Sequence, residues 1–145
     1  EYLKISTIEM GVFKKRGTFK NLKQYELPFV VPVYPIYGVP TRIRGLDGWP
    51  EDAYERKIRH EVTLMESALE LCRQGHCVGY FPFFVIEEHN RKFRSEFHLE
   101  RHPTPYEGRI CRSDVFLIKR KGVNEEQNMK TVAKMIRLGT KTFGV

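Results

Sequence analysis

The sequence lacks several features that would assign it to a special class of protein. No stretch approaches the ~18 consecutive apolar residues that a membrane span needs. Glycine and proline number only 11 and 8 among 145 residues, which excludes collagen-like and low-complexity chains. The hydrophobic fraction of 41% is too high for a disordered chain. We therefore expect one folded domain with a sizeable core.

Cysteine is scarce, and its spacing carries no metal or disulfide signature. Cys72, Cys77 and Cys111 form no CxxC pair and no Cys/His zinc pattern. Buried, reduced thiols are the simpler interpretation, and they indicate a cytoplasmic protein. The first residues are charged and strand-like, which is not the pattern of a signal peptide. The sequence starts without Met inside a periodic segment, so we expect a piece of a longer chain.

Recognised catalytic motifs are also missing. The sequence has no GxSxG, GxxxxGK[ST], GxGxxG or HExxH pattern. His98 and His102 are four residues apart, but their segment has the pattern of a strand and a loop with no third ligand nearby. We expect no catalytic residue, no metal site and no cofactor.

Positive charge is in excess, with 25 Lys and Arg against 18 Asp and Glu, a net charge of +7. The basic residues are spread along the chain, no basic block exceeds three residues, and acids interleave with them. This pattern favours a solvated surface of mixed charge over a nucleic-acid-binding surface.

Hydrophobic periodicity predicts an alternation of strands and helices. Expected strands cover 2–13, 29–33, 57–62, 76–81, 91–99 and 109–121, and expected helices cover 63–73, 83–88 and 124–138. Residues 34–50 are expected to form a long loop. For the last helix we expect a cap at Asn124, an end at Gly139 and a buried stripe of Met129, Val132, Ala133 and Ile136. The order indicates an α/β sheet covered by helices, which binds ligands beyond the carboxyl ends of its strands.

Two segments are candidates for ligand contact. Thr63 and Glu66 have the spacing of a capping box at the start of a helix, whose N-terminus also suits an anion. Thr63 therefore either caps the helix only or contacts a ligand as well. The loop after the strand 29–33 begins with Tyr34 and Pro35, which suits either a pocket wall or the packing of the loop. We expect the helix after Thr63 to end at Gly75 in a left-handed conformation. Its expected apolar face consists of Leu64, Ala68, Leu71 and Cys72.

Residues 61–82 carry a resemblance to a known family. A strand leads through Thr63 into a helix that ends at Gly75, and the next strand stops at Pro82. This run resembles the effector-binding domain of LysR-type transcriptional regulators. Residues 19–30 are similar to the family's entry into its second subdomain, and 114–138 are similar to its return strand and final helix. His76 and Cys77 depart from the family's Gly and small apolar residue, which puts the local packing in question.

The resemblance implies a periplasmic-binding-protein-like (type 2) α/β fold with two subdomains. Residues 11–113 would form a complete second subdomain. Residues 1–10 and 115–145 would form part of subdomain one: its crossover strand, return strand and C-terminal helix. No helix-turn-helix motif occurs in these 145 residues, so DNA contact through that motif would need sequence that this chain lacks.

The resemblance also implies functional roles for seven residues. Matching positions that contact the effector or line its cleft are Val33, Tyr34, Pro35 and Thr63. Matching positions of the hinge between subdomains are Asp114, Val115 and Phe116.

The expected function is the sensing of a small-molecule effector, a carboxylate or another metabolite, in the cleft between the subdomains. A homo-oligomer is implied, with the helix Leu64–Arg73 as a candidate contact, and no membrane is involved. One alternative is a solute-binding module of similar fold that is not linked to transcription. Another is an α/β enzyme, which would require a cluster of perturbed titratable groups that the sequence does not offer.

Overall fold

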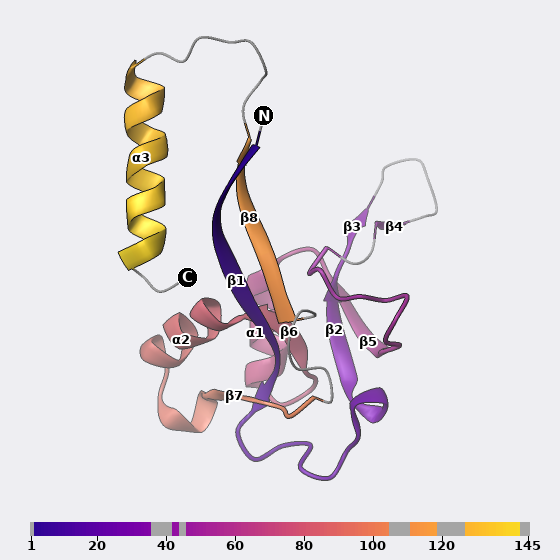
Figure 1. The fold of residues 1–145 in the computed structure, drawn as a ribbon. Coiled ribbons are helices and arrows are strands. Elements are labelled where there is room, and N and C mark those ends of the chain that lie inside the picture. Colours follow the sequence, from indigo (N-terminus) through magenta and orange to yellow (C-terminus); the bar gives the residue numbers. More distant parts are fainter. Residues whose placement is uncertain (1, 36–41, 44–45, 105–110, 119–126, 143–145) are drawn as a thin grey trace. The chain divides into compact units, whose positions relative to one another are not determined.

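The computed structural model describes residues 2–35, 42–43, 46–104, 111–118 and 127–142 (Figure 1). The chain divides into two compact units. Unit 1 contains Glu1–Glu9 and Arg112–Val145, and unit 2 contains Met10–Cys111. Whether these units are the two subdomains of a regulator stays a prediction. No helix in the described ranges is both long and apolar enough to cross a membrane.

Unit 1 contains two paired strands and one helix. The first part of β1 (Tyr2–Lys15) pairs antiparallel with β8 (Arg112–Ile118), in a register from Tyr2 opposite Ile118 to Glu9 opposite Arg112. A bulge shifts this register between Lys4 and Ser6. The strand expected over 2–13 is confirmed, and β8 lies inside the strand expected over 109–121.

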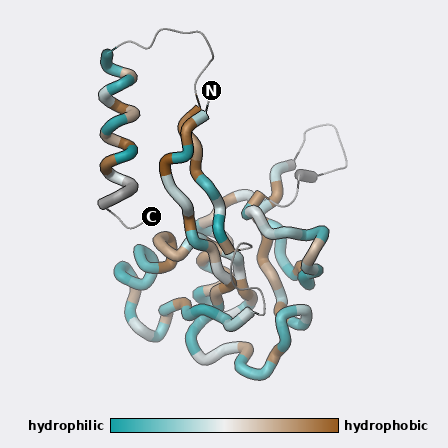
Figure 2. The backbone as a smooth tube through the Cα atoms, in the orientation of Figure 1, coloured by the Kyte–Doolittle hydropathy of each residue, from teal (hydrophilic) through white to brown (hydrophobic). Residues whose placement is uncertain are grey.

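The helix of unit 1, α3 (Gln127–Thr142), differs from its prediction in two ways. It continues through Gly139 because a glycine inside a helix costs only about 1 kcal/mol relative to alanine, so it need not end the helix. The predicted buried stripe is also wrong, since Met129 is 59% and Val132 is 48% exposed. Hydrophobic and hydrophilic residues alternate along α3 (Figure 2), and this periodicity identifies the apolar face without showing what covers it. The expected cap, Asn124, lies outside the described residues.

The centre of unit 2 is a short parallel sheet. β2 (Pro28–Pro32) pairs in parallel with β5 (Lys57–Val62), and on its other side Phe29 forms a parallel bridge with Val78. Phe29, Val30 and Val31 are each at most 2% exposed. The strand expected over 29–33 is therefore confirmed; it is buried on both faces and ends one residue earlier, at Pro32.

The described residues of unit 2 also form two α-helices and strands that pair with β1. The second part of β1 pairs antiparallel with β6 (Gly79–Pro82) and with β7 (Leu99–Arg101). α1 (Met65–Arg73) packs on β2, and α2 (Phe83–Lys92) follows β6 directly. Side chains from these elements form one core: Phe13, Val30, Ala68, Leu69, Cys72, Cys77, Phe81, Ile86 and Leu99.

The end of α1 confirms the expected role of Gly75. This residue has a φ of +84°, the left-handed conformation that favours glycine. Its N–H donates to the Cys72 carbonyl at 2.9 Å, and the His76 N–H donates to the Leu71 carbonyl at 3.1 Å. The two bonds form a Schellman motif, which satisfies carbonyls that the helix end would otherwise leave open.

The segment 91–99 was predicted incorrectly as a strand. Its first residues instead extend α2 to Lys92, where Lys92 and Glu88 form an ion pair at the i, i+4 spacing with a distance of 3.0 Å. A short 3-10 helix, η2 (Ser95–Phe97), follows, and extended structure starts only at Leu99. Local charge pairing along a helix therefore outweighed the weak alternation in this segment.

Three smaller features refine the predicted loops. A single turn of 3-10 helix, η1 (Gln24–Glu26), precedes β2. The long loop expected over 34–50 contains a short antiparallel pair, β3 (Tyr34–Pro35) and β4 (Arg42–Ile43). Residues 51–54 form turns, in which the Ala53 and Tyr54 N–H groups both donate to the Pro50 carbonyl at 3.0 Å.

Candidate functional site

The carboxyl ends of β2 and β5 bring the two candidate segments together. Pro32 lies opposite Val62 in the parallel ladder, and the Val33 N–H donates to the Val62 carbonyl at 2.8 Å. Tyr34 and Thr63 are the next residues on the two strands, so both leave the sheet at the same edge. This is the position where open α/β sheets bind ligands.

The side chains at this edge differ in exposure. Val33 is buried at 5% exposure, whereas Tyr34 is 60% exposed. The ring of Tyr34 is therefore largely open to solvent, and its role in ligand contact stays a prediction. Pro35 lies in β3 opposite Arg42, and its side chain lies outside the described set. Leu64 and Met65 are also exposed, at 64% and 49%, so apolar surface continues from the edge onto the start of α1.

Thr63 does not cap α1, in contrast to the prediction. The N-cap residue is Leu64, which has extended backbone angles and no capping side chain. The helix begins one residue later than the Thr-x-x-Glu spacing requires, so Glu66 lies at the second helical position instead of the third. Thr63 is exposed, and within the described residues its hydroxyl makes no hydrogen bond. This hydroxyl is therefore available for another partner.

The start of α1 provides backbone donors beside Thr63. The first N–H groups of any α-helix lack partners within the helix, and here the Ala68 N–H is bonded to the Leu64 carbonyl at 3.3 Å. The preceding amides therefore face outward with the positive end of the helix dipole. The Glu66 carboxylate in the first turn reduces the local positive potential. Together the edge offers amide N–H groups, one hydroxyl and one phenol ring, a set suited to binding a small polar molecule.

A buried charge cluster in the segment before β5 was missed in the sequence. The Arg56 side chain has no exposed surface, and its guanidinium bonds Asp47 at 2.6 and 3.1 Å. Its Nε atom also donates to Glu51 at 3.0 Å. The only sign of this cluster in the sequence is the spacing of Asp47, Glu51 and Arg56, two acids four residues apart followed by an arginine five residues later. The cluster lies at the amino end of β5, away from the candidate edge, and so has a structural role.

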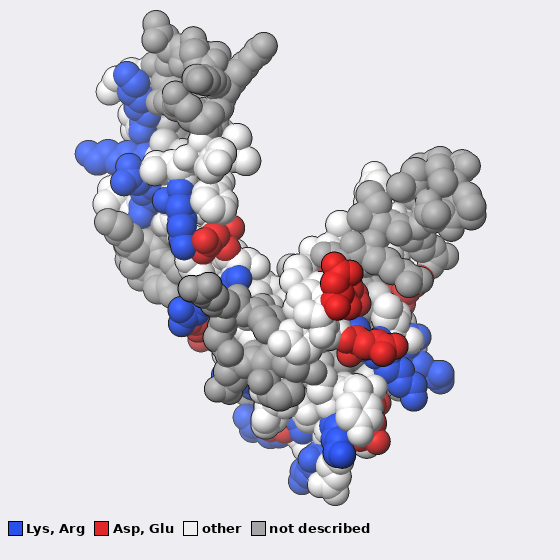
Figure 3. Space-filling view, turned by 45° about the vertical axis from the view of Figure 1, so that its right-hand side comes forward, with Lys and Arg blue, Asp and Glu red and all other residues white. Residues whose placement is uncertain are grey.

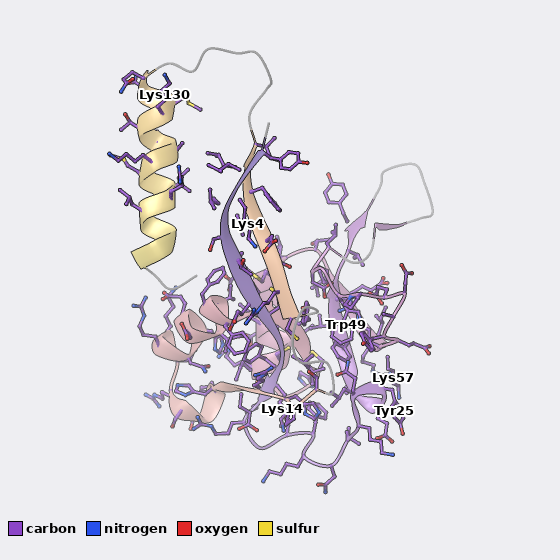
Figure 4. All side chains as sticks on the ribbon, in the orientation of Figure 1. Lys4, Lys14, Tyr25, Trp49, Lys57 and Lys130 are labelled. Carbon is purple, nitrogen blue, oxygen red and sulfur yellow. The ribbon has the colours of Figure 1, made fainter. Side chains whose placement is uncertain are left out.

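Trp49 attaches this segment to the sheet. Its ring centroid lies 5.5 Å from that of Phe29 and 5.2 Å from that of Tyr80, and its indole N–H donates to the Tyr54 carbonyl at 2.7 Å. Figure 4 shows Trp49 beside β2. Because Arg56 also lies over the Trp49 ring at 5.4 Å, the ion pairs and the aromatic contacts support each other.

The titratable groups with shifted pKa values lie in the interior of unit 2 or on exposed ion pairs. Burial raises the pKa of Tyr80, and the hydrogen bond to Cys77 together with burial raises the pKa of the Cys72 thiol. Burial and the charge of Lys14 lower the pKa of His102. Within the described ranges, none of these groups is at the carboxyl edge of β2 and β5. Among the described residues, no three His, Cys, Asp or Glu side chains could hold a metal ion.

The three predicted hinge residues lie inside the β1–β8 ladder of unit 1. Asp114 accepts an ion pair from Lys4 at 2.6 Å and a hydrogen bond from the Thr7 hydroxyl at 2.9 Å, and both lower its pKa. Val115 is opposite Ser6 and Phe116 is opposite Lys4. The division between the units runs before all three, at Cys111 and Arg112. Their role as a hinge stays a prediction.

No family model matches this chain, and no curated protein matches its sequence. Solved structures with the same fold do exist. The bromide-bound regulatory domain of HypT from Salmonella typhimurium is 9% identical, with a TM-score of 0.60 over 98% of this chain and 65% of that one. A variant of the OxyR2 regulatory domain from Vibrio vulnificus is 14% identical, with a TM-score of 0.63 over 98% of this chain and 66% of that one. Full-length CbnR, complexed with its target DNA, is 17% identical, with a TM-score of 0.64 over 97% of this chain and 48% of that one.

The chain thus spans less than two thirds of the length of these regulatory domains. The predicted fold class is confirmed, because nearly the whole chain matches them in order. The chain has the periplasmic-binding-protein-like type 2 fold that is seen in the regulatory domains of LysR-family transcriptional regulators.

Proposed function

We propose that this chain is the effector-sensing part of a LysR-type transcriptional regulator. The observation that supports the proposal is the open edge of unit 2, where Val33, Tyr34 and Thr63 leave two parallel strands beside the start of α1. The solved structures with this fold are regulatory domains, and one of them belongs to a protein complexed with DNA. The proposal places the protein in the cytoplasm and gives it a binding role, with no catalysis.

The effector in this proposal is a small molecule with a carboxylate or a comparable acceptor group. The outward-facing amides at the start of α1 would donate to its oxygen atoms, as would the Thr63 hydroxyl. The exposed ring of Tyr34 would cover an apolar part of the ligand. Val33 would hold the edge in place through its bond to Val62, and Pro35 would restrict the backbone that follows Tyr34.

Signalling would follow from a shift between two arrangements of the subdomains. Residues 11–113 would form one wall of the cleft, and the partial subdomain of 1–10 and 115–145 would contribute to the other. A hinge at Asp114, Val115 and Phe116 would connect them. An effector can move such an equilibrium only by the difference between its affinities for the two states. DNA contact would come from a helix-turn-helix that this sequence lacks, and oligomer contact from α1.

A ligand titration followed by NMR tests the site. The probes are succinate and benzoate, one dicarboxylate and one aromatic acid, added to the ¹⁵N-labelled 145-residue chain. We expect shift changes centred on the amides of Tyr34 and of Thr63 to Glu66. Thr63→Val should lower the affinity for whichever acid binds by about five- to tenfold, because it removes one hydrogen bond worth roughly 1 kcal/mol. Thr131→Val, on the exposed surface of α3, is the matched control and should leave the affinity unchanged.

Two outcomes would contradict the proposed site. One is a response of these acids at amides elsewhere in the chain. The other is an equal loss of affinity in both threonine variants, which would indicate that Thr63 makes no direct contact with the acid.

A further inference from the structure

The helix α3 carries a row of cations along one face. Lys130, Lys134, Arg137 and Lys141 follow the spacing i, i+4, i+7 and i+11, which places them in one stripe of a helix. Lys130, Lys134 and Arg137 are exposed. Figure 3 shows Lys and Arg side chains following one another along this helix, and Figure 4 labels Lys130 near its start.

No acid on the helix balances this row. Gln127–Thr142 contains three Lys and one Arg but neither Asp nor Glu. Lys130 and Lys134 form no ion pair with any described residue. Like charges at the i, i+4 and i, i+3 spacings repel each other and lower the stability of a helix. An anionic partner would remove this repulsion. In the linear sequence these cations are separated by neutral residues, and only the helix brings them together.

The row is separate from the apolar stripe of the same helix. Met129, Val132 and Ile136 have the spacing i, i+3 and i+7, and this stripe is centred about a third of a turn from the cations. The helix can therefore turn its apolar stripe toward other protein while its cations face a separate partner.

The composition of α3 argues against a membrane as that partner. Helices that lie in a membrane surface carry Trp, Phe or Leu on their apolar face. Gln127–Thr142 contains no aromatic residue, and its single leucine, Leu138, lies outside the apolar stripe of Met129, Val132 and Ile136. A straight row of cations about 16 Å long instead suits a partner whose charges are themselves arranged in a row, such as a phosphate backbone.

We propose that the basic row of α3 binds the phosphate backbone of double-stranded nucleic acid without reading its sequence. The cations would neutralise phosphates and release condensed counterions, which makes the affinity fall steeply with salt. Each phosphate contact would add about −0.9 to the slope of log K against log salt concentration, so Lys130 and Lys134 together would contribute about −1.8. This inference rests on α3 alone and is independent of the proposed effector site in unit 2.

The test is a fluorescence anisotropy titration of the 145-residue chain with a labelled DNA duplex of mixed sequence, roughly 20 base pairs long, between about 50 and 200 mM salt. The double variant Lys130→Gln/Lys134→Gln should bind about tenfold more weakly at low salt, and its slope should be smaller by about 2. The double variant Lys20→Gln/Lys57→Gln removes the same charge from exposed positions in unit 2 and should leave the slope unchanged. Circular dichroism would verify that the variants keep their helix content.

Three results would overturn the proposal. The first is an absence of DNA binding by the unchanged chain at about 50 mM salt, where non-specific contacts are strong. The second is an equal loss of DNA affinity in both double variants, which would show that the binding depends on the net charge of the chain and not on the basic row. The third is binding to phosphatidylglycerol vesicles that depends on Lys130 and Lys134 when DNA binding does not, which would assign the row to a membrane surface.

Discussion

Asn90 pairs with the backbone of Leu99 through both atoms of its side-chain amide. Its Nδ2 atom donates to the Leu99 carbonyl at 2.9 Å, and its Oδ1 atom accepts from the Leu99 N–H at 2.9 Å. The side chain thus makes the two bonds that a neighbouring strand would make, and it fixes the place where the chain returns to the sheet after α2.

We expect Asn90→Ala to destabilise the chain by about 2 to 3 kcal/mol, since two partly buried backbone groups would lose their partners. Urea unfolding measured by circular dichroism provides this free energy. Asn21→Ala, at an exposed position, should change it by less than about 0.5 kcal/mol. A comparable loss in both variants would contradict the assigned role of Asn90.

Arg56 neutralises acids that the fold removes from water. The Asp47 side chain is only 7% exposed, so replacing Arg56 by Met leaves a buried carboxylate without its cation. We expect a loss of about 3 to 5 kcal/mol in the free energy of unfolding. Arg59→Met changes an exposed residue of the neighbouring strand β5 and should cost little. If the double variant Arg56→Met/Asp47→Leu recovers none of the loss, the cause is packing and not the buried charge.

Thr63 contributes little to the stability of α1. Because the helix begins after Leu64 and Thr63 makes no capping bond, Thr63→Ala should change the free energy of unfolding by less than about 0.5 kcal/mol. A true N-cap threonine would cost about 1 kcal/mol in the same thermal or urea measurement. A loss of that size would restore the capping role and weaken the case for a ligand at this hydroxyl.

His102 makes stability depend on pH. Its pKa in the folded chain is lowered from 6.5, first by burial and then by the charge of Lys14. The unfolded chain therefore binds a proton more readily, and the contribution of neutral His102 is fully present above pH 6.5 and is lost as the pH falls. His102→Gln should flatten the decrease in unfolding free energy between about pH 7 and about pH 5. His76→Gln, at an exposed position, should leave the curve unchanged, and an effect as large as that of His102→Gln would indicate a general charge effect.

Local pattern was sufficient where a segment is buried on both faces or ends at a glycine with a required conformation. The run from Phe29 to Val31 predicted the central strand, and Gly75 predicted the end of α1. Pattern was insufficient where the deciding contact is distant in the sequence. The Asn90 clamp on Leu99 joins residues nine positions apart and could not be read from the alternation within residues 91–99.

For the candidate site, the order of strands and loops along the chain was informative, whereas the contacts of individual side chains could not be predicted. The two segments that carry Val33, Tyr34 and Thr63 were each predicted to follow a strand, and the parallel register brings them to the same edge. The Arg56 cluster was missed because an ion pair between Asp47, Glu51 and Arg56 has no periodic signature. The roles of Val33, Tyr34, Pro35 and Thr63 in binding remain predictions, to be tested by the titration.

The pairing of β1 has a consequence for how the chain folds during synthesis. β1 is complete at Lys15, yet its partners lie in β6, β7 and β8, which end at Pro82, Arg101 and Ile118. At about 5 to 20 residues per second, a ribosome needs roughly 5 to 20 seconds to make the intervening hundred residues. The second part of β1 gains a partner when β6 is complete, but the first part, Tyr2 to Glu9, stays unpaired until β8 is made. During that time the emerging chain carries an unpaired stretch of β-strand that is open to association with other chains.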